Sequence, residues 1–326
     1  MTGMIVDEIT VSSKSLRKEI SAQVQADSQL KPIWYRWKGE AAFAPGDVIL
    51  CSVLVPAMKA GGTLVFNGTI SKELNSRLPQ LQRLLIENRV GLRPIEIEVT
   101  SISNGSANTQ SYPEPTSGAL FYSDVSAFYT LLKNHQQIQD LVFVQNSLNG
   151  SGMATIKGKI LFKRYASVLK KTFLEIETNS AILMEPPKNR QAFANSLMAI
   201  VLAMIFSSRI DHLYIPSANG AGSDPGDRIL ELLSPLLKEH GTEMIVGDAG
   251  KTVGEKIGAI ASDPLFMDAL RTCWENPYRN YNCGRCAICS RNEKAEKIVK
   301  RLGSDEFEKF ASGLEYKNQP DSELRN

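Results

Sequence analysis

Four of the five cysteines lie close together, at Cys273, Cys283, Cys286 and Cys289. Four thiolates are a complete tetrahedral ligand set for zinc, and the Cys-x2-Cys spacing brings ligands together over short turns. Gly284 stands inside the first of these steps, where a turn often needs a positive φ angle. The pattern predicts a structural zinc site, because four protein ligands leave no coordination position open for water or substrate.

An iron–sulfur cluster is the main alternative, since it too is commonly held by four cysteine thiolates. Cys273 stands ten residues before Cys283 and no proline follows Cys289, so the bacterial ferredoxin pattern is not matched. The spacing therefore favours zinc and leaves the cluster as the alternative. The fifth cysteine, Cys51, lies in the apolar run VILCSVLV, which predicts a buried core residue.

The composition is typical of a globular protein, with 43% hydrophobic and 22% charged residues among 326. A net charge of +2 gives no general attraction to nucleic acid or to membranes. The longest apolar stretch, 193–206, is too short to cross a bilayer and predicts a buried helix. Asp7 and Glu8 stand where a signal peptide would have a basic start, and clustered reduced thiols suit a reducing compartment. We therefore expect a cytoplasmic protein without membrane contact.

Residues 1–105 are expected to form a smaller α+β domain. The run TLVFNGTIS (63–71) predicts a strand with a turn at Asn67-Gly68. Leucines at helical spacing predict a helix over 71–89, with Ser71 as its N-cap. The apolar segment DVILCSVLVPAM fits either a strand or a helix by periodicity.

The segment 106–117 is rich in Ser, Pro and Thr and is interpreted as a linker. Strands and helices alternate after it, which predicts an α/β domain over 118–302 with a doubly wound parallel sheet. Ligands bind such sheets beyond the carboxyl ends of the strands. The zinc site at 273–289 would form a C-terminal knob on this domain, and 303–326 is expected to be a helix and a polar tail.

Several segments together resemble the PP-loop ATP pyrophosphatase superfamily: FYSDVSAFYTLLKN, DLVFVQ, HLYIPS and the terminal CWEN…NCGRCAIC. The resemblance covers roughly residues 116–302 and is greatest to the group related to cyano-deazaguanine synthase. It implies a nucleotide-binding α/β fold that uses ATP and Mg²⁺ to adenylylate a carboxylate, releasing pyrophosphate. The region before it is similar to an extra domain of some uncharacterised members of that group.

Members of this family carry a Ser-Gly-Gly-x-Asp-Ser loop, whose glycines let backbone N–H groups approach phosphate. Here Ser123 matches the first serine, both glycines are absent, and Asp124 brings a carboxylate to the place of the phosphates. Ser126 stands near the position of the family's Asp and Ser. Two interpretations stay open: Ser123 or Asp124 caps the following helix, or Ser123, Asp124 and Ser126 form a rearranged nucleotide site.

Other polar groups are weaker candidates. His135, His212 and His240 fall at helix ends or strand starts and are expected to be surface or capping residues. The Gly-rich loops 146–159, with Lys157 and Lys159, and 217–228 are expected to be plain connections, with phosphate binding as the alternative.

Three functions follow as hypotheses. The first is a zinc-containing binding or structural subunit with a degenerate nucleotide site, partnered by another protein, by an active relative or by itself. The second is an active ATP-dependent ligase. The third is a nucleic-acid-associated subunit using arginines near the cysteines. The aromatic run IWYRWKG, with Trp34, Tyr35, Arg36 and Trp37, is the candidate protein-binding anchor, or else part of the core.

Overall fold

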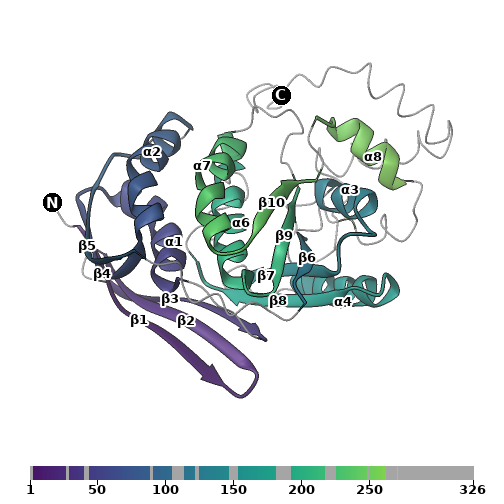
Figure 1. The fold of residues 1–326 in the computed structure, drawn as a ribbon, viewed down its shortest axis with the longest axis horizontal. Coiled ribbons are helices and arrows are strands. Elements are labelled where there is room, and N and C mark those ends of the chain that lie inside the picture. The colour runs from purple at the N-terminus through teal and green to yellow at the C-terminus, as the bar shows by residue number, and fades with distance from the viewer. Residues whose placement is uncertain are drawn as a thin grey trace.

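The computed structural model describes residues 3–26, 29–39, 44–88, 91–104, 114–121, 125–146, 153–180, 192–216, 225–247, 250–261 and 270. In this part of the chain the protein has an α/β fold with one ten-stranded, mostly parallel sheet and helices on both faces (Figure 1). The four cysteines of the predicted zinc knob lie outside the described residues. The described helices include none that combines the length and apolar character needed to cross a bilayer.

The N-terminal half begins with an antiparallel meander of three strands and continues as strand and helix in alternation. Its elements are β1 (Met4–Lys14), β2 (Arg17–Ala26), β3 (Gln29–Lys38), α1 (Pro45–Ala60), β4 (Thr63–Ser71), α2 (Lys72–Asn88) and β5 (Glu96–Ser103). β4 pairs in parallel with β1 on one side and with β5 on the other. α1 packs on β4, β1 and β2, so it covers one face of the meander.

The segment that periodicity left undecided is the helix α1, whose residues are buried almost all round because the sheet and α6 enclose it. The helix predicted after Ser71 is confirmed: Ser71 Oγ accepts a hydrogen bond from the N–H of Leu74 at 3.1 Å. The turn predicted at Asn67-Gly68 is wrong. β4 runs through it with a register shift between Phe66 and Thr69, since a glycine in a strand also suits a bulge.

The C-terminal half contains the predicted alternation of strands and helices. Its elements are β6 (Thr116–Leu120), α3 (Val125–Lys133), β7 (Asp140–Asn146), α4 (Met153–Val168), β8 (Thr172–Thr178), α6 (Ala192–Phe206), β9 (Ile210–Ile215), α7 (Pro225–Glu239), β10 (Glu243–Val246) and α8 (Val253–Ala261). All strand pairs among β6 to β10 are parallel. The sheet order is β10-β9-β6-β7-β8-β3-β2-β1-β4-β5.

The two halves share this one sheet. β3 pairs antiparallel with β8, and the register places Tyr35 opposite Thr178. β5 ends at Ser103 and β6 begins at Thr116, inside the segment predicted as a linker. The predicted domain boundaries stay predictions, but strand pairing runs without a break from one half into the other.

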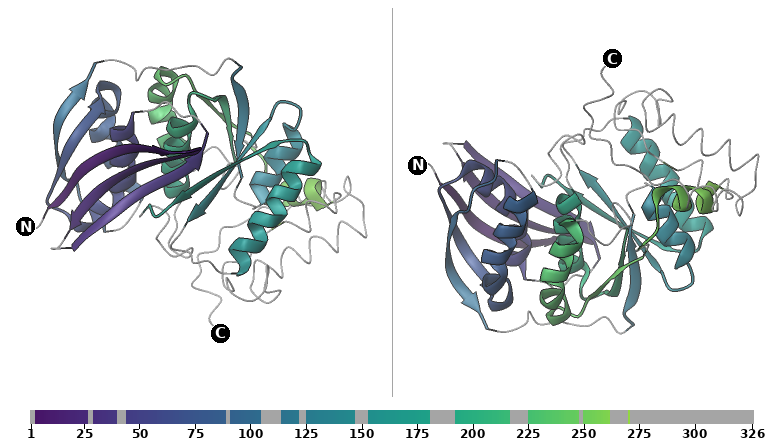
Figure 2. Two further views of the ribbon diagram at one scale, coloured as in Figure 1. Left: turned by 90° about the horizontal axis from the view of Figure 1, so that it is seen from below. Right: turned by 90° about the horizontal axis from the view of Figure 1, so that it is seen from above.

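Two hydrophobic clusters lie on the two faces of the sheet. The larger packs α1, α2, α6 and α7 against one face, and the smaller packs α3, α4 and α8 against the other. Figure 2 shows these two groups of helices on opposite sides of β6 to β9 (Figure 2). The buried helix predicted over 193–206 is confirmed by α6, and Cys51 is buried in the larger cluster as expected.

Candidate ligand site at the carboxyl ends of the parallel strands

The strand order creates a point where the chain reverses its direction of travel across the sheet. From β6 the chain moves outward to β7 and β8, and it then returns to form β9 and β10 on the other side of β6. In open α/β sheets a ligand binds at such a switch point, outside the carboxyl ends of the two central strands. Gly118 lets Ile210, the first residue of β9, pack closely on β6, since a Cβ atom at Gly118 would stand 2.6 Å from Ile210 Cδ1; this contact lies toward the amino ends of the two strands.

Two polar side chains meet beside this point. Ser126 lies in the first turn of α3, the helix that follows β6, and is only 8% exposed. Lys256 of α8 is fully buried, and its Nζ donates a hydrogen bond to Ser126 Oγ at 3.0 Å. A fully buried lysine is rare because the ammonium group loses its hydration. This pair is therefore an unusual polar contact among the described residues at the switch point.

A capping box fixes the helix that carries Lys256. Thr252 Oγ1 accepts a hydrogen bond from the N–H of Glu255 at 3.2 Å, and Glu255 Oε2 accepts one from the N–H of Thr252 at 2.8 Å. Burial opposes ionisation of Glu255, but the hydrogen bonds from Thr252 and Lys251, with the charge of Lys251, outweigh it and lower the pKa of the carboxyl. These contacts fix the start of α8, and the helix itself packs on α3.

The end of β10 also packs against α3. A Cβ atom on Gly247 would lie 2.3 Å from Thr130 Cγ2, so the chain can pass here only as glycine unless a neighbour moves. Asn134 Nδ2 donates to the carbonyl oxygen of Gly247 at 3.4 Å. The carboxyl end of β10 is therefore attached to the same helix that carries Ser126.

The structure brings only part of the predicted site together. Ser126 lies at the switch point, whereas Ser123 and Asp124, the other two candidates for nucleotide binding, lie outside the described residues. Cys273, Cys283, Cys286 and Cys289 lie outside them as well. Within the described part of the chain, no group of three or more His, Cys, Asp or Glu side chains could hold a metal ion.

Lys159, proposed as a possible phosphate ligand, is engaged with its neighbours in the sheet. Its Nζ forms an ion pair with Glu175 of β8 and lies 3.5 Å from Gln145 Oε1 of β7. Among the histidines, the expectation of a surface position is wrong for His240, which follows α7 and is 2% exposed. The start of α1, a distant segment in the sequence, lies beside it, with Asp47 Oδ2 3.8 Å from His240 Nε2.

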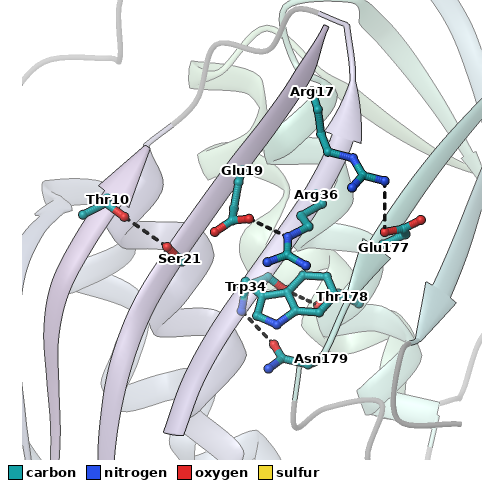
Figure 3. A network of polar contacts seen from close by, with 9 residues as sticks. All are labelled: Thr10, Arg17, Glu19, Ser21, Trp34, Arg36, Glu177, Thr178 and Asn179. Atoms are coloured by element: carbon teal, nitrogen blue, oxygen red, sulfur yellow. Dashed lines mark hydrogen bonds and ion pairs between the residues drawn. The ribbon is translucent and has the colours of Figure 1, made fainter. Parts of the chain in front are cut away.

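The aromatic run of β3 alternates between the two faces of the sheet. Tyr35 and Trp37 belong to the core, whereas Trp34 and Arg36 point to the other face, so the run is not one exposed anchor. Arg36 stacks on the Trp34 ring, 4.0 Å from its centroid, and its Nε donates to Glu19 Oε2 at 2.5 Å. Figure 3 shows this stack beside the joint of β3 and β8 (Figure 3).

The same joint is reinforced by Asn179 and Thr178, which follow and end β8. Asn179 Oδ1 accepts a hydrogen bond from the N–H of Trp34 at 2.7 Å, and Thr178 Oγ1 donates to the carbonyl oxygen of Trp34 at 2.8 Å. Trp34 is thus fixed by its backbone while its ring lies over the sheet. A held aromatic ring loses little entropy on binding a partner.

Sequence reasoning missed Lys256. The Thr252-x-x-Glu255 pattern marks the start of its helix, but nothing in a single sequence marks a lysine as buried. Comparison of the sequence with protein-family models and with curated proteins found no match.

Proposed function

We propose that this chain is a zinc-containing binding or structural subunit, built on a PP-loop-like α/β fold whose nucleotide site no longer turns over ATP. The observation that carries the proposal is the hydrogen bond from Lys256 Nζ to Ser126 Oγ at 3.0 Å. Ser126 takes the place of a polar residue of the family's phosphate loop. Its hydroxyl is buried and already engaged by a neighbouring helix, which leaves it poorly placed to bind phosphate.

The sequence around Ser126 supports the same conclusion. The two glycines that would open a phosphate-binding loop are absent, and Asp124 adds a negative charge next to the place of the phosphates. The fold of such a site can persist after its chemistry is lost, because function resides in the grafted residues and not in the sheet. We therefore assign the retained fold to binding.

Zinc would be held by Cys273, Cys283, Cys286 and Cys289, whose four thiolates complete a tetrahedral ligand set. Bound there, the metal would supply folding free energy rather than chemistry. The partner would be another protein, an active relative or a second copy. The Trp34–Arg36 stack is the candidate anchor on this chain, because Trp and Arg dominate the energetics of protein interfaces.

Calorimetric titration with ATP and Mg²⁺, AMP and pyrophosphate tests the proposal. The wild-type protein is expected to bind none of them at millimolar concentration, and S126A is expected to behave identically. Micromolar affinity of the wild type for any of these ligands, abolished in S126A, would contradict the proposal that Ser126 does not bind phosphate.

One observation favours a second candidate, an ATP-dependent enzyme that adenylylates a carboxylate. Lys256 places an ammonium group next to the first turn of α3, and a helix N-terminus together with a cation is a common arrangement for binding phosphate. In that case ATP affinity would be lost in K256M, which keeps the length of the buried side chain. K159M is the matched control, because Lys159 is already paired with Glu175.

A further inference from the structure

A second buried polar pair lies far from the switch point, between the start of α1 and the end of α7. The side chains of Asp47 and His240 are 0% and 2% exposed, and Asp47 Oδ2 lies 3.8 Å from His240 Nε2. This distance is too long for a hydrogen bond. Asp47 Oδ2 and both ring nitrogens of His240 have no hydrogen-bond partner among the described residues. Buried polar groups are rarely left in this state, so the pair needs an explanation.

Asp47 is fixed in the first turn of α1. Gly46 lets this turn approach β4 closely, because a Cβ atom there would stand 1.9 Å from the carbonyl oxygen of Thr69. Asp47 Oδ1 accepts a hydrogen bond from the N–H of Ser71 at 2.8 Å, and Ser71 caps α2. The carboxylate therefore joins the starts of α1 and α2.

His240 is fixed at the end of α7 by a Schellman motif. The N–H of Thr242 donates to the carbonyl oxygen of Leu237 at 3.0 Å, and the N–H of Gly241 donates to that of Lys238 at 3.0 Å. Gly241 has the positive φ of 85° that this motif requires. His240 is thus held directly at the C-terminal end of a helix.

Helix dipoles favour opposite charges at these two positions. The N-terminal turn of α1 stabilises a carboxylate, and the C-terminal end of α7 stabilises an imidazolium. A lone buried carboxylate would be costly without a counter-charge, whereas an ion pair offsets much of that cost. We propose that Asp47 and His240 form a charged latch, carboxylate against imidazolium, which holds the start of α1 on the end of α7 and opens when His240 gives up one proton.

The charged neighbours of this pair on α7 and α2, which are Lys238, Glu239 and Lys72, are exposed, whereas Asp47 and His240 are buried. Burial raises the pKa of the Cys51 thiol, and the charge of Asp47 adds to the rise, so Cys51 stays neutral. The described side chains of α6, from Ser196 to Phe206, include no charged group. Several other charged groups nearby are paired with one another: Glu73 with Arg77 on α2, Glu87 of α2 with Arg228 of α7, and Arg209 with Asp140.

The latch would act on the contact between the two halves of the molecule. α1 and α2 belong to the N-terminal half, and they pack on α6 and α7 of the C-terminal half. Deprotonation of His240 would leave a carboxylate buried in that contact without its counter-charge. The helical layer would then loosen first at the Asp47–His240 pair, while the strands β3 and β8 stay joined.

Nitrogen-15 NMR of the histidine rings in the full-length protein tests the latch. At pH 7 both ring nitrogens of His240 are expected to be protonated in the wild type, and the ring is expected to be neutral in D47N. His135 and His212 are more exposed and serve as internal references, and H240Q assigns the signal. A neutral His240 ring in the wild type would overturn the proposal, even if D47N failed to fold.

A double-mutant cycle gives a second readout. D47N and H240Q are each expected to lower the ratio of folded to unfolded protein by roughly a hundredfold, because each leaves its partner unpaired in the interior. In the double variant this ratio should fall by a factor at least tenfold smaller than the product of the two single-variant factors. Simple additivity would contradict the latch. E87Q, which breaks the exposed Glu87–Arg228 pair between α2 and α7, is the matched control and should change stability less than about threefold.

Discussion

Arg209 forms a bidentate ion pair with Asp140 beside the start of β6. Arg209 Nε lies 2.7 Å from Asp140 Oδ2, and Arg209 Nη2 lies 2.9 Å from Asp140 Oδ1. The Asp140 side chain is 1% exposed. Thr116, the first residue of β6, donates to the same carboxylate at 2.7 Å. One buried carboxylate therefore ties together the starts of β7, β6 and β9 at the edge of the sheet opposite the candidate site.

R209M is expected to lower the free energy of unfolding by about 3–5 kcal/mol, because it leaves the Asp140 carboxylate buried without its counter-charge. Denaturant unfolding followed by circular dichroism measures this loss. T116V removes only a neutral donor and should cost about 1 kcal/mol. Equal stability of R209M and wild type would show that the Arg209–Asp140 pair contributes nothing to the free energy of unfolding.

Metal analysis of protein purified in reducing buffer is expected to find one zinc per chain. C283S should lower the zinc content and the melting temperature, since the metal contributes folding free energy through its ligands. C51S is the matched control, because Cys51 is buried in the core and should leave the zinc content unchanged. Iron with sulfide, or no metal at all, would reject the zinc site.

Glu255 is expected to make the free energy of unfolding depend on pH in the acidic range. Its pKa is lowered in the folded state, so the stabilisation is present above the ordinary carboxyl range and is lost as the pH falls through the folded value. E255Q is therefore expected to be less stable than wild type at pH 7 and to approach it below about pH 4. Unfolding measured across this range checks the sign, and a constant difference between the two proteins would contradict it.

Tyr35 is expected to make the protein less stable as the pH rises in the alkaline range. Burial raises its pKa to about 12 from 10.0, although hydrogen bonds with Ser180, Ser52 and Thr178 favour ionisation. A raised pKa stabilises the folded state below pH 10 and loses this effect as the pH rises toward about 12. Y35F should lack this alkaline loss of stability, and it should be less stable at pH 8 by about 1 kcal/mol because the 2.6 Å contact with Ser52 is gone.

The Trp34–Arg36 stack is expected to act in binding rather than in folding. W34A should keep the circular dichroism spectrum of the wild type and lose the protein partner that co-purifies with it, or its self-association in sedimentation. L30A is the matched control, because Leu30 lies on the same strand and is 64% exposed. A monomer that captures no protein, together with unfolding of W34A, would contradict the partner proposal.

Local sequence patterns predicted the parts of the fold that local chemistry decides. Short apolar runs with polar ends predicted β6 to β10, and the serine before a leucine-rich helix predicted the start of α2. The helical state of α1 could not be predicted, because its residues are apolar on every side and only packing distinguishes a buried helix from a buried strand.

The candidate site was less predictable for a similar reason. Ser126 was identified from its position after a strand, but its donor Lys256 lies on a helix that meets α3 only in the folded chain. The position of His240 at a helix end was predicted, yet its burial depends on α1, which is remote in sequence. Burial of a charged group is a property of the tertiary fold, and residue type alone argues against it.

The joint between β3 and β8 has a consequence for any attempt to divide the molecule. A chain split between residues 104 and 114 would give two fragments, and each would expose a strand that the intact sheet pairs internally: β3 in one and β8 in the other. Unpaired strands of this kind recruit other strands and cause aggregation. Produced separately, the fragments would be insoluble; produced together, each would be the missing edge of the other, and the protein would assemble by complementation.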